Sequence, residues 1–178
     1  MFEDYIQDAY SFYHLACKSE ADGNERDAKM YYRASIFCAA SAMEAFMNFL
    51  GDTLKKGNAL DIYQLAFIND KTLEFAPAKL KVQEKVKYNA IDEKVKFIIK
   101  RFDVPITIST SSDWTNFLNF KELRDSLIHP KNVSDEKSLV EYKRNIANGL
   151  NSIIDIINNI SFKVFEKHLR KSVAELKL

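Results

Sequence analysis

Apolar residues recur every three or four positions over long stretches of this chain, which is the spacing of one face of an α-helix. The first stretch covers residues 2–20 and the second covers residues 25–50, where Gly51 supplies a common helix stop. A basic amphipathic helix is predicted over 81–101, and another helix over 112–129. A long apolar helix follows residues 134–136, and a last basic helix is predicted over 162–175.

The segments between these helices are short. Residues 59–80 predict short helical pieces interrupted by Pro77, and the β-branched run 104–110 predicts a loop. Ser-Ser-Asp at 111–113 and Ser-Asp-Glu at 134–136 are suited to cap the helices that follow them. We therefore predict an all-α fold, a bundle of four main helices with extra short helices.

Composition agrees with this prediction. The chain has only four glycines and three prolines, so it offers few tight turns for a sheet with many hairpins. Its 178 residues predict a single domain, 1–178, with a core over about 5–160 and the C-terminal helix over about 162–175. The net charge is only +1, but residues 79–101 hold eight bases against three acids. Such a segment suits either a polyanion or a solvated helix face.

Nothing in the sequence predicts a cofactor, a metal or a membrane anchor. The chain has no glycine loop for phosphate, no zinc-ligand spacing and no carboxylate–histidine cluster. The N-terminal residues carry acids where a signal peptide carries bases. The most apolar run is about 15 residues long and contains Glu44, which is too short and too polar to cross a bilayer. We expect a soluble, cytoplasmic protein.

The helix over 112–129 has an unusually wide apolar face. At 100° per residue, its apolar positions span an arc of about 220°, where one core needs little more than about 100°. The excess predicts two buried sides, one against the bundle and one against a second subunit. The positions are Trp114, Phe117, Leu118, Phe120, Leu123, Leu127 and Ile128.

Arg124 falls inside this arc, and His129 ends the helix just before Pro130. On an ideal helix the two side chains lie about 140° apart, so they share a site only if the helix ends or a second chain contributes. A purely structural reading is also open. Arg124 would then bury its stem and reach an acid, and His129 would be favoured by the helix dipole.

The order of these features resembles the HEPN superfamily. It consists of a small-residue amphipathic helix (ASIFCAASAMEAFMNFLG), a helical region, LRDSLIHP at a helix end and a long apolar helix. The HEPN signature is an arginine followed by a polar residue and, after a gap of four to six residues, a histidine. Here these are Arg124, Asp125 and His129. The resemblance implies an up-and-down helical bundle and metal-independent cleavage of single-stranded RNA at a composite site in a homodimer.

On that resemblance, His129 is the acid–base group and Arg124 stabilises charge on phosphorus, with Asp125 orienting one of them. Glu44 is a supporting candidate that could hold Arg124, and Asn48 is a weaker one. Lys121 and Lys131 flank the motif and are candidates for RNA phosphate contacts. Members paired with a nucleotidyltransferase antitoxin carry a tyrosine where this chain has Lys131. Regulation through that tyrosine is therefore not expected, although a cognate antitoxin or regulator remains a candidate partner.

Two other readings stay open. A non-catalytic HEPN-like module would bind RNA, a nucleotide or a protein without cutting, and replacement of His129 would change little. An antitoxin or scaffold bundle unrelated to nucleic acid would show no salt-dependent RNA binding.

Overall fold

The chain folds into long helices with one small hairpin. The computed structural model describes residues 1–76, 79–129 and 137–178. The helices are α1 (Phe2–Ala21), α2 (Glu25–Lys56), α3 (Ile62–Ile68), α4 (Ile91–Arg101), α5 (Ser112–Ile128), α6 (Leu139–Phe165) and α7 (Lys171–Ala174). The strands are β1 (Lys71–Ala76) and β2 (Lys79–Val86). The described chain is mostly helical, which agrees with the all-α prediction.

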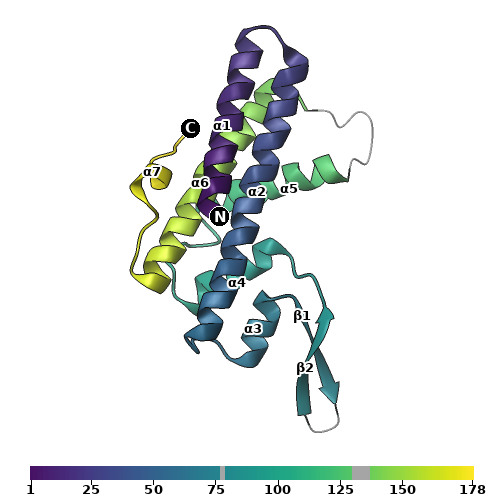
Figure 1. Ribbon diagram of the computed structural model, residues 1–178, viewed down its shortest axis with the longest axis vertical. Coiled ribbons are helices and arrows are strands. Elements are labelled where there is room, and N and C mark those ends of the chain that lie inside the picture. Colours follow the sequence, from purple (N-terminus) through teal and green to yellow (C-terminus); the bar gives the residue numbers. More distant parts are fainter. Residues whose placement is uncertain (77–78, 130–136) are drawn as a thin grey trace.

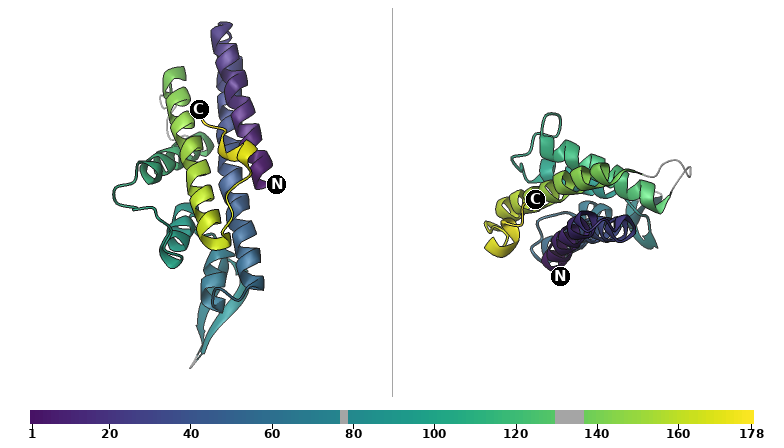
Figure 2. Two further views of the ribbon diagram at one scale, coloured as in Figure 1. Left: turned by 90° about the vertical axis from the view of Figure 1, so that its left-hand side faces the viewer. Right: turned by 90° about the horizontal axis from the view of Figure 1, so that it is seen from above.

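Three helices run along the long axis of the molecule and one lies across it. Figure 1 shows α1, α2 and α6 side by side, with α5 crossing them and ending beyond α2. In Figure 2 the α1–α2 hairpin forms one side of the molecule, α6 runs along it, and α4 and α5 lie on the far side. The helix that carries the arginine and histidine therefore lies across the bundle axis.

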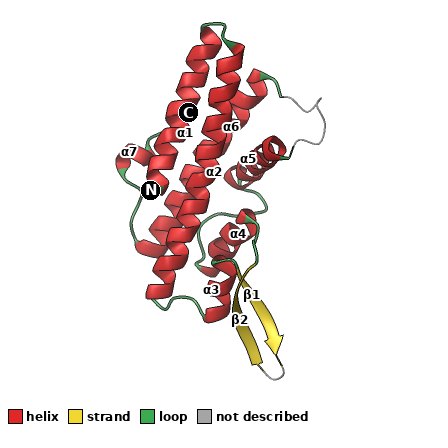
Figure 3. Cartoon of the chain, turned by 45° about the vertical axis from the view of Figure 1, so that its right-hand side comes forward, coloured by secondary structure: helices red, strands yellow, loops and turns green. Residues whose placement is uncertain are grey.

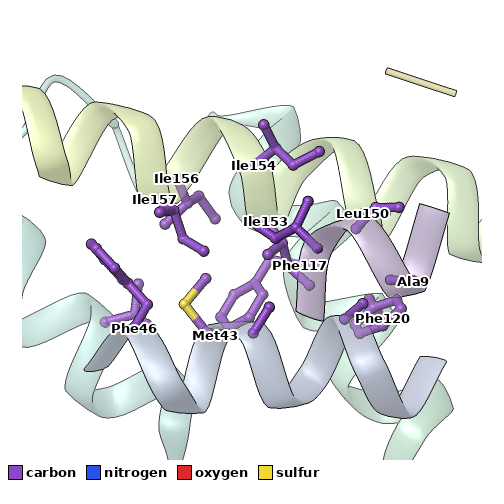
Figure 4. Packing of buried hydrophobic residues seen from close by; sticks show 14 of the residues in the cluster. Ala9, Met43, Phe46, Phe117, Phe120, Leu150, Ile153, Ile154, Ile156 and Ile157 are labelled. Atoms are coloured by element: carbon purple, nitrogen blue, oxygen red, sulfur yellow. The ribbon is translucent and has the colours of Figure 1, made fainter. Parts of the chain in front are cut away.

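The core lies where these four helices meet. Met43 and Phe46 of α2 face Ile153 and Ile157 of α6 (Figure 4), and all four side chains are buried. Phe117 and Phe120 of α5 fill the space between α2 and α6 in the same cluster. Burial of large apolar side chains contributes about 1.5–3 kcal/mol each, so this cluster anchors α5 to the bundle.

A glycine permits the closest contact of α5 with α6. A Cβ atom added at Gly149 of α6 would lie 2.3 Å from Cδ2 of Phe120. A methyl group does not fit there, since carbon atoms prefer separations of about 3.5–4.0 Å. Gly149 thus sets how deeply Phe120 enters the core and, through it, where the rest of α5 lies.

The predicted basic helix over 81–101 is wrong in its first half. Residues 79–86 form β2, which pairs antiparallel with β1, and α4 begins only at Ile91. The short helical pieces predicted for 59–80 are represented by α3 alone. The hairpin projects from one end of the bundle (Figure 3).

The C-terminal prediction is also wrong in its boundaries. Residues 162–165 still belong to α6, Glu166 ends that helix with φ of 54°, and α7 is only four residues long. At the other end, α6 begins at Leu139 with Ser138 as its cap, in a capping box with Glu141. Residues 134–136, expected to be the cap, lie outside the described residues.

Gly51 does not stop α2, which continues to Lys56. A Cβ atom at Gly51 would lie 2.4 Å from Oδ1 of Asn69, so this glycine lets the segment after α3 approach the helix. By length and composition alone, α2 is the one described helix that could span a membrane. Half of the most apolar 18-residue stretch of α2 is buried inside the protein, as in a core helix. The fold is compatible with a soluble protein.

Candidate functional site

The two ends of α5 are fixed by local chemistry. Ser111 caps its first turn by accepting a hydrogen bond from the backbone N–H of Trp114, as predicted. At the other end, the N–H of His129 donates to the carbonyl oxygen of Asp125 at 2.9 Å, but His129 itself leaves the helical conformation, with φ −125° and ψ 65°. A residue before proline disfavours the helical conformation, which explains why the helix ends there. The side chain of His129 is exposed.

Arg124 is held by the residue that follows it. Its Nη1 donates to Oδ1 of Asp125 at 2.8 Å, and Nζ of Lys121 lies 3.4 Å from the other carboxylate oxygen. Lys121 also lies 3.5 Å from Oδ1 of Asp92 on α4. This oxygen is buried and accepts no hydrogen bond from the described groups, so Lys121 compensates its charge by proximity alone. Asp125 therefore positions Arg124.

Partial burial by itself raises the pKa of Asp125, but the hydrogen bond from Arg124 and the charge of Lys121 outweigh it, and the pKa is lowered. Burial likewise acts to lower the pKa of Lys121, but the carboxylates of Asp92 and Asp125 outweigh it and the pKa is raised. Asp125 thus stays ionised and already serves two cations. It is suited to fixing a guanidinium and poorly suited to taking a proton from a substrate.

Two hollows meet at Arg124 and Glu44. The smaller one, about 20 Å³, has room for about one water and is lined mainly by core residues from α2, α5 and α6. The larger one, about 310 Å³, opens to solvent beside α1, α2 and the end of α5. Arg124 and Glu44 line both. The other residues lining the larger hollow are Met1, Tyr5, Phe37, Ala40, Ser41, Ala45, Asn48 and Ile128.

Glu44 is a half-buried carboxyl group between two cations. Burial raises its pKa, the charges of Lys94 and Arg124 oppose this rise, and the carboxylate of Asp70 adds to it. Lys94 is only 3% exposed, and its Nζ lies 2.6 Å from Oδ2 of Asp70. The site therefore rests on alternating charges from α2, α4 and α5 rather than on one ion pair.

The structure brings together most of the predicted residues. Arg124, Asp125 and Lys121 form one ion-pair network on α5, and Glu44 and Asn48 of α2 face the same hollow as Arg124. Lys121 is committed to two carboxylates, which weakens the expectation that it contacts RNA phosphate. Lys131 lies outside the described residues.

Asp92 and Lys94 are members that sequence reasoning missed. Lys94 had a signal, because Ile91, Lys94 and Ile98 share the helical spacing of a buried stripe. Asp92 had none, since its partner Lys121 is distant in the sequence.

Most of the wide apolar arc of α5 is buried within the chain itself. Trp114, Phe117, Phe120 and Leu123 are buried against the bundle, so the arc does not by itself require a partner. Leu118 and Leu127 are half-buried, and Ile128 in the last turn is 42% exposed. Phe37 of α2, also at the edge of the larger hollow, is 41% exposed.

No group of three or more histidine, cysteine, aspartate or glutamate side chains in the described ranges is arranged to hold a metal ion. Comparison of the chain with protein-family models, with curated proteins and with solved structures finds no match.

Proposed function

We propose that this protein is a metal-independent endoribonuclease of the HEPN type that cleaves single-stranded RNA as a homodimer. The observation that carries the proposal is the end of α5. There Arg124 is fixed by Asp125 at the edge of an open hollow, and His129 is exposed where the helix ends. Arg124 and His129 lie about 8 Å apart along the helix axis, within the reach of one phosphodiester and its ribose.

RNA supplies its own nucleophile, so the protein needs only proton transfer and charge stabilisation. His129 removes the proton from the ribose 2′-hydroxyl, and the 2′-oxygen attacks phosphorus. The bond from phosphorus to the 5′-oxygen breaks, and a protonated histidine, from the same or the second copy, gives that oxygen a proton. Arg124 stabilises the negative charge that builds up on the phosphoryl oxygens. The products are a 2′,3′-cyclic phosphate and a 5′-hydroxyl.

The second copy is part of the proposal for two reasons. His129 does not line the hollow that Arg124 lines, so a facing pair of α5 ends is the arrangement that supplies each phosphate with both groups. The exposed Phe37 and Ile128 beside the hollow also favour contact with an apolar surface. We further propose a cytoplasmic toxin or defence effector of a prokaryote, with no cofactor and with a cognate antitoxin as candidate partner.

One observation favours binding without cleavage. The ring of His129 has no hydrogen-bond partner among the described residues that would fix its orientation, whereas Arg124 is held firmly. A module that grips an RNA phosphate with Arg124 and does not cut it would have the same local structure. The two functions differ in whether replacement of His129 abolishes a reaction.

The test is cleavage of a labelled single-stranded RNA of mixed sequence in excess EDTA. We expect wild-type protein to cut and to leave cyclic phosphate ends, and His129→Ala to lose activity by about 10²-fold or more. His14→Ala is the matched control, because His14 is an exposed histidine on α1 that packs against Tyr10. Products with 3′-hydroxyl ends, or equal cleavage by wild type and His129→Ala, would contradict the mechanism. Binding without cleavage by either would favour the binding module.

A further inference from the structure

One exposed face of α2 connects the Arg124 hollow to a cluster of positive charge. Arg26, Arg33, Phe37, Glu44 and Asn48 fall within an arc of about 60° on this helix. Glu44 and Asn48 line the hollow beside Arg124, and Phe37 lies at its edge. The two arginines continue the same line toward the beginning of α2, the end of the hairpin drawn at the top of Figure 1.

The beginning of α2 presents two exposed arginines, Arg26 and Arg33. Arg26, Lys29 and Arg33 line an open hollow of about 450 Å³ together with Glu25. The carboxylate of Glu25 lies 2.9 Å from Nζ of Lys29. Arg26 and Arg33 have no carboxylate within 4.0 Å in the part of the chain that the structure describes, and both are exposed. Two guanidinium groups are thus available to an anion.

Apolar side chains are interspersed with these cations. Met30 is 46% exposed and Phe37 is 41% exposed, and both belong to the same side of α2 as Arg26 and Arg33. An exposed aromatic ring between cations is suited to a strand that offers both bases and phosphates, because a base stacks on the ring while its phosphates meet the guanidinium groups. An acidic peptide would use the charges but not the ring.

We propose that this face of α2, from Arg26 to Asn48, is the track along which single-stranded RNA reaches the Arg124 hollow. This inference rests on the proposed function and assigns its substrate contacts outside the reacting groups. Arg33 and Phe37 hold the nucleotides next to the hollow, and Arg26 holds the more distant ones. The rise of the helix puts Arg26 about 27 Å from Glu44. That length corresponds to about eight nucleotides at the 3.4 Å spacing of a stacked strand, and to fewer in an extended one.

Binding is measured separately from cleavage. Fluorescence anisotropy follows labelled 2′-O-methyl RNA, which lacks the nucleophile and cannot be cut, with oligonucleotides of about three and about nine nucleotides, so that only the longer one spans the track. The variant is Arg26→Gln/Arg33→Gln. The matched control is Lys55→Gln/Lys56→Gln, which removes two exposed charges from the other end of the same helix. Circular dichroism verifies that each variant remains folded.

We expect wild-type protein and the control to bind the longer RNA more tightly than the shorter one. The arginine variant should lose this gain, with an affinity on the order of 10–25-fold weaker near 0.1 M salt and a salt dependence reduced by about 1.4, the value for two phosphate contacts on a single strand. The short RNA should bind all three proteins alike. The track is refuted if the arginine variant binds the longer RNA as the control does, or if wild type gains nothing from length. If wild-type protein fails to cut ordinary single-stranded RNA but still binds the longer 2′-O-methyl RNA more tightly than the shorter one, the nuclease is refuted and the track stands.

Discussion

The close contact of α5 and α6 at Gly149 makes one substitution especially informative. In Gly149→Ala the new methyl carbon would lie 2.3, 2.5 and 2.6 Å from Cδ2, Cγ and Cβ of Phe120. Rotation of the ring cannot relieve this overlap, because the Cβ and Cγ atoms are too close as well. Phe120 is 2% exposed, and the hollow of about 20 Å³ that it borders has room for about one water rather than for a phenyl ring. We therefore expect α5 as a whole to shift.

Two opposing effects decide the magnitude. Alanine in the middle of a helix is about 1 kcal/mol more favourable than glycine, since it loses less backbone entropy. Overpacking of a buried contact costs about 1–3 kcal/mol, and an overlap of more than about 1 Å places this site at the upper end. We expect a net loss of about 2 kcal/mol in the free energy of unfolding. For a chain of this size, that loss corresponds to a decrease of about 4–8 °C in Tm.

Urea unfolding followed by far-UV circular dichroism measures this loss. Gly57→Ala is the control, because the nearest atom to its added methyl is the carbonyl oxygen of Thr53 at an ordinary 3.7 Å. That variant should change stability by less than about 0.5 kcal/mol. Phe120→Ala removes two of the three overlapping atoms, so in that background Gly149→Ala should cost less than half as much. A neutral or stabilising Gly149→Ala in the wild-type background would refute the described packing of α5 on α6.

Two further predictions concern the charges around Glu44. Asp70→Asn removes the direct ion-pair partner of the buried ammonium group of Lys94 and should cost about 3–5 kcal/mol in urea unfolding, whereas Lys94→Met, which removes the buried charge itself, should cost much less; equal effects would argue against a buried pair. The pKa of Glu44 is raised above its ordinary 4.5 because burial disfavours the ionised form, so the folded state holds this proton more tightly and ionisation of Glu44 lowers stability as pH rises through its folded-state pKa. Glu44→Gln should therefore stabilise the protein above that pKa and have no effect well below 4.5, and thermal melts at both ends of this range would contradict the assignment if the variant were less stable at high pH.

The sequence predicted those elements whose signals are local. The periods of α1 and α2 and the Ser111 cap of α5 each depend on residues within a few turns, and the structure confirms them. The hairpin was missed although its second strand alternates, with Lys79, Lys81 and Gln83 against Leu80 and Val82. Lysine and glutamine are also frequent in helices, and the partner strand is needed to decide between the two periods.

Gly51 was misread because glycine has two uses. It ends helices, but it also permits close approach of another segment, and only the position of Asn69 shows that the second applies here. The candidate site could be predicted only in part, because some of its contacts join residues that are distant in the sequence. Arg124 and His129 became candidates through their place at the end of an apolar helix and through the resemblance to the HEPN superfamily. The pairing of Lys121 with Asp92 and of Lys94 with Asp70 joins residues 29 and 24 positions apart, which no local pattern indicates.

The base of the β-hairpin is closed on itself. The backbone N–H of Lys87 donates to the carbonyl oxygen of Asp70 at 2.8 Å, and the Asp70 side chain accepts from the N–H of Asn89 and from the buried Lys94. The chain thus leaves the bundle and returns to it at a single point, tied to α4. With this arrangement, the length of the hairpin can change without affecting the stability of the helical bundle. Over evolutionary time the hairpin could grow, shrink or change its surface while α2, α4 and α5 kept their places around Arg124.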